Sequence, residues 1–218
     1  MSIDTVLSSC KDVAVYSAFQ IPEMPGLVLK LSDVCSVAEC EAVIAIAEKA
    51  GFVRASFFTD KDGVEHYSEI RKSDRCILDS KPFAAELFRR LLPNLPAEFN
   101  GCKVVGVNER LRILKYSPGD EFQLHSDGCY ISPVDGSYSV LTILLYLNEG
   151  YEGGFTTFLD IHGEYVALQP HVGMVTLQEQ PLLHLVPPLE KGVKYILRTE
   201  VMVAAAAYKE AEVKVVKV

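Results

Sequence analysis

The first half of the chain contains a segment whose apolar residues recur at helical spacing. Between residues 37 and 50 they stand at positions 40, 43, 44 and 47, and Gly51 follows where helices often end in a left-handed residue. Ser32 and Asp33 are the expected N-terminal cap. The pattern predicts a helix over 37–50.

A second helix is predicted from Lys81 to Leu92. Pro82 lies in its first turn, and residues 83, 87 and 91 are apolar and form one stripe. The stretch 56–65 between the two helices is polar and contains an Asp-Gly turn signal. The first half is therefore expected to consist mainly of helices and loops.

From residue 103 onward the apolar pattern changes to the period of strands. Short runs rich in Val, Ile, Leu and Thr are separated by Pro-Gly, Glu-Gly-Gly and Lys-Gly turns. The predicted strands are 103–107, 110–116, 139–147, 164–168, 172–177 and 193–203. Strands that follow helices favour an α+β domain, and a double-stranded β-helix of the jelly-roll or cupin type fits best.

The length of 218 residues fits one domain. We divide 1–218 into a preamble of helices and first strands (1–102), a β-helix core (103–203) and a tail (204–218). The tail is assigned no chemistry.

Composition narrows the functional classes. The chain is 49% hydrophobic and 23% charged, as in ordinary globular proteins, and its net charge of −8 argues against a nucleic-acid binder. The first twenty residues lack the pattern of a secretory signal, and no apolar run has the length of a membrane span. The six cysteines contain no Cys-x-x-Cys pair and are expected to be free thiols, which favours a cytoplasmic protein.

The chemistry is concentrated at His125-Ser126-Asp127 and at His184, 57 residues further on. Two imidazoles and one carboxylate on one face of an iron(II) ion form the facial triad of oxygen-activating non-heme iron enzymes. On a regular strand His125 and Asp127 would share one face, and a folded sheet could bring His184 to the same ion. The other histidines, at 66, 162 and 171, have no carboxylate or cysteine at ligand spacing and are expected to be ordinary polar residues.

Several segments together resemble the prolyl 4-hydroxylase-like, 2-oxoglutarate- and iron(II)-dependent dioxygenases. The segment 112–127 looks like the family's Tyr-x-Pro-Gly approach to a His-x-Asp motif, and 142–148 resembles its strand ending in Tyr-Leu-Asn. Residues 153–158 resemble its Gly-Gly-x-Thr-x-Phe segment, and 170–173 and 184–194 match its closing strands. The match runs from about residue 111 to 202, with a helical preamble before it.

The resemblance implies a double-stranded β-helix that holds iron between His125, Asp127 and His184. The co-substrate 2-oxoglutarate would chelate the iron, and its far carboxylate would meet Lys194, which stands ten positions after His184. Arg198, four residues beyond Lys194, is the alternative partner for this carboxylate, or else pairs with a carboxylate such as Glu200. Further cavity-lining residues implied by the resemblance are Tyr146 or Thr156 beside the far carboxylate, and Tyr116 and Thr142.

The resemblance also implies an activity. An unactivated C–H bond would be hydroxylated with O₂, 2-oxoglutarate would leave as succinate and CO₂, and ascorbate is a further expected cofactor. Peptidyl proline is the family's default substrate. A free amino acid or other small molecule, or a cupin-like module that binds metal without turnover, are the alternatives. The presence of Asp127 favours hydroxylation over halogenation, since related halogenases lack this carboxylate.

The positions at which this sequence departs from the family pattern affect the expected shape of the substrate pocket and leave the expected metal ligands unchanged. Leu177 stands where the family often has Phe, and the chain contains no tryptophan. The loops 56–67 and 129–138 are candidate substrate lids. A peptide or a small molecule is thus expected as partner, with no nucleic acid and no membrane.

Overall fold

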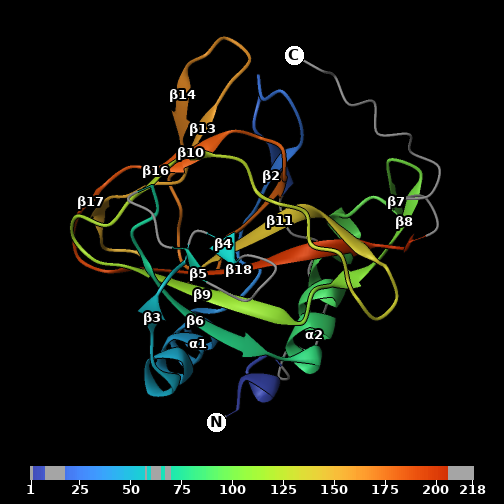
Figure 1. Cartoon of the computed structure of the whole chain (residues 1–218), viewed down its shortest axis with the longest axis horizontal. Coiled ribbons are helices and arrows are strands. Elements are labelled where there is room, and N and C mark those ends of the chain that lie inside the picture. Colours follow the sequence, from blue (N-terminus) through green and yellow to red (C-terminus); the bar gives the residue numbers. More distant parts are fainter. Residues whose placement is uncertain (1, 8–17, 57, 60–64, 67–69, 206–218) are drawn as a thin grey trace.

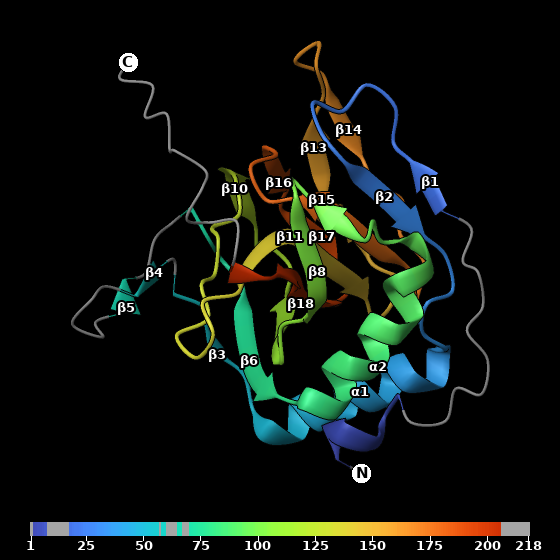
Figure 2. The same ribbon diagram turned by 90° about the vertical axis from the view of Figure 1, so that its right-hand side faces the viewer.

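The computed structural model describes residues 2–7, 18–56, 58–59, 65–66 and 70–205. Two sheets face each other, and two helices cover the outer side of the larger sheet (Figures 1 and 2). All strand pairs in this part of the chain are antiparallel. The predicted α+β jelly roll is confirmed.

The larger sheet has ten strands, and β18 lies near its centre. Its main order is β1 (Ala18–Gln20), β2 (Val28–Leu31), β15 (Val175–Glu179), β11 (Tyr138–Tyr146), β18 (Lys194–Val203), β9 (Arg110–Tyr116), β6 (Asp74–Asp79) and β3 (Val53–Arg54), while β8 (Cys102–Val107) pairs with β18 and with β7 (Glu98–Phe99).

The second sheet is smaller and closes over the inner face of the first. Its order is β10 (Phe122–His125), β16 (His184–Val186), β13 (Thr157–Leu159) and β14 (Tyr165–Ala167), and two short pairs are β12 (Glu152–Gly153) with β17 (Leu189–Lys191) and β4 (Phe58–Thr59) with β5 (Glu65–His66).

The two-residue period of the central strands sorts their side chains between two environments. On β18, Leu197 and Val201 are fully buried in the main apolar core against the helices, whereas Lys194, Ile196 and Arg198 alternate with them and face the smaller sheet. Strands β9 and β11 alternate in the same way. One face of the large sheet therefore builds the core, and the other forms the floor of a cavity.

The helices have the predicted positions, but their caps were only partly predicted. Helix α1 is Val37–Ala50 and is capped by Ser36, whose side chain forms a capping box with Glu39. The expected cap at Ser32 and Asp33 was wrong, because Ser36 stands directly before the first helical turn and the box supplies both of its hydrogen bonds. Helix α2 is Lys81–Leu91, and the short 3₁₀ helices are η1 (Ile3–Thr5) and η2 (Leu92–Asn94).

A buried arginine joins the two helices. The Arg90 side chain of α2 is 1% exposed, and its guanidinium lies 2.7 Å from Glu39 of α1 and 3.1 Å from Glu86. It also donates to the backbone carbonyl of Val34 at 2.9 Å. The fully buried charge is thus paired and hydrogen-bonded, as burial of a charge requires.

The expectation that the first half consists mainly of helices and loops was wrong. It contributes β1, β2, β3 and β6 to the large sheet, with β2 pairing with β15 and β6 pairing with β9. These strands are short or carry charged residues at both ends, so they lack the alternating pattern that makes a strand visible in a sequence. Strand β15 also begins at Val175, because residues 170–173 form a loop rather than the start of the strand.

Four cysteines, at 35, 40, 76 and 102, are free and buried, and Cys129 is free and exposed. These agree with the expected free thiols, while Cys10 lies outside the described residues. The tail beyond residue 205 and much of the 56–67 loop are likewise outside them. Among the helices of the described part, none has the length and apolar character to cross a bilayer.

Gly173 is the glycine whose replacement should cost most. Its φ is +81°, and a Cβ built there would lie 1.9 Å from the carbonyl oxygen of Cys35. We expect Gly173→Ala to lower the free energy of unfolding by more than about 2 kcal/mol, because backbone has to move to relieve the overlap. Gly163, with φ +82° and open space around it, is the control, and Gly163→Ala should cost only about 1 kcal/mol of left-handed strain. Urea unfolding of both variants measures the difference, and equal losses would contradict the prediction.

Candidate active site

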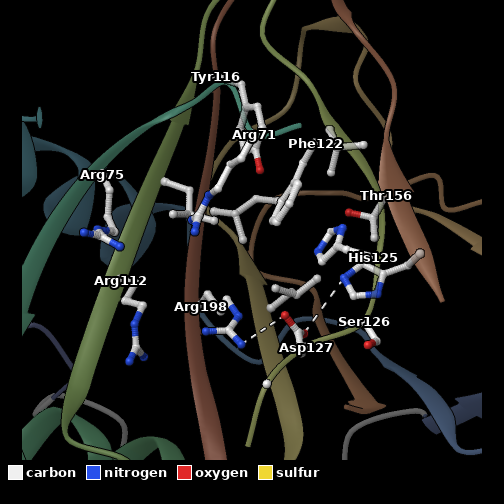
Figure 3. Close-up of a pocket in the computed structure, with 16 residues that line it drawn as sticks. Arg71, Arg75, Arg112, Tyr116, Phe122, His125, Ser126, Asp127, Thr156 and Arg198 are labelled. Carbon is white, nitrogen blue, oxygen red and sulfur yellow. Dashed lines mark ion pairs between the residues drawn. The ribbon is translucent and has the colours of Figure 1, made fainter. Parts of the chain in front are cut away.

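A cavity of about 400 Å³ lies between the two sheets. Its floor includes Leu114 and Tyr116 of β9 and Ile196 and Arg198 of β18, and its opposite wall includes His125 and His184. Figure 3 shows His125 and Asp127 on one side of this space and arginine side chains on the other. Apolar walls with a few converging polar groups are typical of a ligand site.

The three predicted iron ligands come together at this cavity. His125 on β10 and His184 on β16 are directly opposite each other in the strand register, with ring centroids 4.2 Å apart. Ligand atoms of His125, Asp127 and His184 all lie within 4.8 Å of one another. Two imidazole nitrogens and one carboxylate oxygen are the donor set of a facial triad, so the group could hold iron(II).

Asp127 reaches the site in a different way from the one expected. Strand β10 ends at His125, so the carboxylate is not placed by alternation along a strand. Instead, the backbone N–H of Asp127 donates to the carbonyl of Gln180 at 2.8 Å, which ties the segment after β10 to the loop before β16. This bond turns the Asp127 side chain toward the cavity.

Hydrogen bonds orient both imidazoles. The Nδ1 atom of His125 lies 2.7 Å from the carbonyl of Gln123, and that of His184 lies 2.9 Å from the carbonyl of Leu182. With Nδ1–H donating to these carbonyls, each Nε2 carries the lone pair that a metal requires, and that of His184 also lies 3.4 Å from the Gln178 amide nitrogen. Burial, reinforced by the neighbouring His184, lowers the pKa of His125 to about 4, so its ring is neutral at pH 7, as a ligand must be.

The Asp127 carboxylate is held from two sides. Thr142 of β11 donates its hydroxyl to Oδ2 at 2.6 Å, and the Arg198 guanidinium lies 3.0 Å from Oδ1. Burial alone would raise the pKa of Asp127, but the charge of Arg198, aided by His184 and Thr142, outweighs it and lowers the pKa to about 2. The carboxylate is therefore ionised at any physiological pH.

Lys194 lies at the far end of the same face of β18. It is fully buried, donates to the carbonyl of Gly154, and sits over the rings of Tyr116 and Tyr151 at 5.2 and 5.9 Å. No carboxylate of the described residues pairs with it, and burial lowers its pKa to about 7. The hydroxyl of Tyr151 is also buried without a hydrogen-bond partner. A buried ammonium that lacks a counter-ion fits an end of the site that receives an anion.

Other residues expected at the site are also close to it. Tyr116, Thr156 and Arg198 line the cavity itself. Tyr146 is buried and donates to the Thr156 hydroxyl at 3.1 Å. Thr142 contacts the cavity through Asp127, as described above, so it supports the expected metal ligand.

Sequence reasoning missed three arginines and one aromatic ring. Arg71, Arg75 and Arg112 line the cavity, and Phe122 stacks on His125 with ring centroids 3.4 Å apart. The placement of Arg112 on the same strand face as Tyr116 was the available signal. Arg75 lies in β6 and Arg71 just before it, and the sequence did not reveal this strand.

The two other histidines whose side chains are described take no part in this cluster. His162 is exposed and His171 is half-buried, and each lies 3.9 Å from a surface carboxylate, of Glu23 and Asp33 respectively. The side chain of His66 is outside the described part. The expectation that His162 and His171 are ordinary polar residues agrees with these positions.

Comparison with known proteins supports the resemblance seen in the sequence. No family model matches the chain. Over 128 residues it is 27% identical to the probable prolyl 4-hydroxylase 4 of Arabidopsis thaliana, and this alignment covers 56% of the chain and 40% of that protein. The chain thus spans less than half the length of this curated relative.

Solved structures share the fold over most of the chain. A prolyl-4-hydroxylase from Pseudomonas putida superposes with a TM-score of 0.59 at 17% identity, covering 91% of this chain and 98% of that one. The viral collagen prolyl hydroxylase from Paramecium Bursaria Chlorella virus-1, solved as a complex with 2-oxoglutarate, superposes with a TM-score of 0.53 at 19% identity, covering 80% and 95%. The resemblance to the prolyl 4-hydroxylase-like oxygenases is confirmed. At these identities, the solved structures show a common jelly-roll fold.

The hydrogen bond from Thr142 to Asp127 should matter for metal affinity. We expect Thr142→Val to weaken binding of Fe(II) or Co(II) by about 10- to 100-fold, because the carboxylate loses a contact that orients it. Thr199, which is also buried and donates to the carbonyl of Asn108 away from the cluster, provides the control variant Thr199→Val. Anaerobic metal titration measures both, and an unchanged affinity in Thr142→Val would show that the hydroxyl does not support the site.

Proposed function

We propose that this protein is an iron(II)- and 2-oxoglutarate-dependent hydroxylase of unactivated C–H bonds. The observation that carries the proposal is the convergence of His125, Asp127 and His184 on one cavity, with the fully buried Lys194 next to the cavity-lining Tyr116. No carboxylate of the described residues pairs with this lysine. The shared fold and the resemblance to prolyl 4-hydroxylases support it.

In this proposal iron is held by His125, Asp127 and His184. When bound, iron supplies open coordination positions for O₂ and the co-substrate, so that one oxygen atom enters the substrate as hydroxyl and the other enters succinate as CO₂ is released. The neutral His125 ring and the ionised Asp127 are in the protonation states that metal binding requires.

Lys194 is the proposed partner for the far carboxylate of 2-oxoglutarate. Arg198 is the weaker candidate, because its guanidinium already pairs with Asp127 at 3.0 Å and with Glu200 at 2.9 Å. The linked hydroxyls of Tyr146 and Thr156 would help to hold the co-substrate. The pairing with Glu200 agrees with the alternative role foreseen for Arg198.

The proposal also includes the domain organisation, a further cofactor and the location. Residues 1–218 are treated as one oxygenase domain, and ascorbate is a proposed further cofactor. We expect a cytoplasmic protein without nucleic-acid or membrane partners. Peptidyl proline is supported as substrate by what the relatives are named for. A small molecule remains the alternative substrate, and a non-catalytic metal-binding module the alternative role.

Anaerobic titration with Fe(II) and 2-oxoglutarate tests the proposal directly. Chelation of the metal by the co-substrate should give a weak visible charge-transfer band in the wild type. Asp127→Ala should abolish it, because one of the three ligands is lost. Asp79, a surface carboxylate paired with Arg110, gives the control Asp79→Ala, which should keep the band. A band that survives Asp127→Ala counts against the ligand assignment, and a band without any succinate release favours the non-catalytic module.

Lys194 should make co-substrate binding depend on pH. Lys194 pairs with a carboxylate only when protonated, and its pKa in the free protein is about 7. Binding of 2-oxoglutarate therefore takes up a proton above this pH, and the dissociation constant should rise by about tenfold per pH unit there and level off below it. Removal of the charge in Lys194→Met should weaken binding at pH 6.5 by at least about 30-fold, or 2 kcal/mol.

Titrations of the charge-transfer band at pH 6.5, 7.5 and 8.5 measure this dependence. The variant should also lose most of the rise above pH 7. If Lys194→Met binds 2-oxoglutarate as the wild type does, the far carboxylate is held elsewhere, and Arg198 becomes the first alternative.

A further inference from the structure

One side of the cavity carries more positive charge than the described chain neutralises. Arg71, Arg112 and Arg198 all line it, and Figure 3 shows these three side chains on the side of the cavity away from His125. Arg112 and Arg198 are direct neighbours across β9 and β18. Like charges placed opposite each other in a sheet repel unless a counter-ion lies between them.

The carboxylates next to these arginines are already shared. Glu200 is 1% exposed and lies 2.9 Å from Arg112 and 2.9 Å from Arg198. Asp127 lies 3.0 Å from Arg198 and belongs to the proposed iron site. Neither carboxylate is free to neutralise a further arginine.

Arg71 has no carboxylate partner among the described residues. Its contacts are the backbone carbonyl of Ser56 at 3.3 Å and the face of Phe122, whose ring centroid is 5.0 Å away. Its Nε atom is buried without a hydrogen-bond partner. Burial, together with the charges of Arg75 and Arg198, lowers the pKa of Arg71. A desolvated guanidinium in this state is a favourable binding site for an anion, to which it can donate two parallel hydrogen bonds.

Arg198 and Lys194 occupy separate ends of the site. They are four residues apart on one face of β18, which corresponds to about 13 Å along a strand. The proposed iron ligands lie beside Arg198, and Arg112 is its direct neighbour across the sheet. A 2-oxoglutarate molecule that reaches from the metal to Lys194 therefore leaves Arg198 and Arg112 at the other end, where the substrate binds, and Arg71 lines the same cavity.

We propose that the substrate is a small organic acid, whose carboxylate or phosphate is held by Arg71 together with Arg112 and Arg198. This inference rests on the proposed hydroxylase function and names its substrate class. The cavity of about 400 Å³ also has to receive the co-substrate, and pockets of roughly 300–1,000 Å³ are the usual size for one small molecule. The closeness of Arg198 to Asp127 places the acid group within a few bonds of the carbon that is hydroxylated.

Matched pairs that differ in a single acid group test the inference on the protein loaded with Fe(II) and 2-oxoglutarate. The pairs are L-proline, L-leucine and L-glutamate, each against the amide of its α-carboxyl group, O-phospho-L-serine against L-serine, and an acetylated proline peptide with a free or an amidated C-terminus. Substrate-stimulated succinate release gives KM and kcat, and the charge-transfer band reports binding independently of turnover. At least one member with the additional carboxylate or phosphate should have a KM tenfold or more below that of its partner without that group.

Variants locate the effect. Arg71→Gln should raise KM for that acid at least tenfold with little change in kcat or in 2-oxoglutarate affinity, since it removes binding shared by the ground and transition states. Arg71→Lys should restore part of the affinity. Arg110, an exposed arginine of the same sheet that pairs with Asp79, gives the control Arg110→Gln, which should change neither constant.

Each other outcome counts against the inference. Equal use of acids and amides, or no stimulation by either member of every pair while the band forms, overturns it and leaves the proposed function in place. Stimulation by the peptide alone would overturn the assignment to a small molecule. Failure of the band in the wild type would instead remove the proposed function, and this inference with it.

Discussion

The burial of charged side chains on the inner face of β18 is the constraint around which the site is arranged. Lys194, Arg198 and Glu200 alternate with apolar residues that complete the core, so the same strand that stabilises the fold also carries three ionisable groups into the interior. Charges in this position need partners. The way each one is satisfied explains the layout of the cavity.

The three charges are satisfied to different extents. Glu200 receives Arg112, Arg198 and the amide of Asn108, which donates at 2.9 Å, and is fully compensated. Arg198 is shared between Glu200 and Asp127. Lys194 has only a carbonyl oxygen and two aromatic faces. Along β18, charge compensation therefore decreases from Glu200, which has several partners, to Lys194, which has no counter-ion among the described residues. The negatively charged co-substrate is expected to bind at the Lys194 end.

The three proposed metal ligands already have hydrogen-bond or ion-pair partners in the metal-free protein. Both imidazoles lie against backbone carbonyls, and Asp127 is held by Thr142 and Arg198. Such contacts fix the ring orientation and the charge state, and they reduce the reorganisation that metal binding would otherwise require. Arg198 also compensates the charge of Asp127 in the metal-free protein, so its guanidinium links the metal site to the arginine side of the cavity.

The sequence predicted those features that depend on strong local patterns. Alternation on β9, β11 and β18 predicted the jelly roll, and the spacing of His125, Asp127 and His184 together with the resemblance to a known family predicted the residues that meet in it. The helix over 37–50 was visible from its stripe, although its cap at Ser36 was not chosen. Asp127 was expected on a strand but is positioned by a single loop hydrogen bond, which no local pattern reveals. Arg71 and Arg75 were missed because β6 has charged ends and joins the sheet only through its long-range pairing with β9.

The charge balance of the loaded site follows from these positions. Iron(II) and the dianion of 2-oxoglutarate carry equal and opposite charge, so the net charge of the loaded site is the one that the protein has with Lys194 protonated. The negative charges of Asp127 and Glu200 compensate only part of the positive charge of Lys194, Arg198, Arg112 and Arg71. Water can solvate the remaining cations only while the cavity is open. An amide would expel that water and accept some of its hydrogen bonds, but it would leave the charge of the desolvated arginines uncompensated. An acid would compensate this charge, which makes the arginine side of the cavity selective against neutral molecules of the same shape.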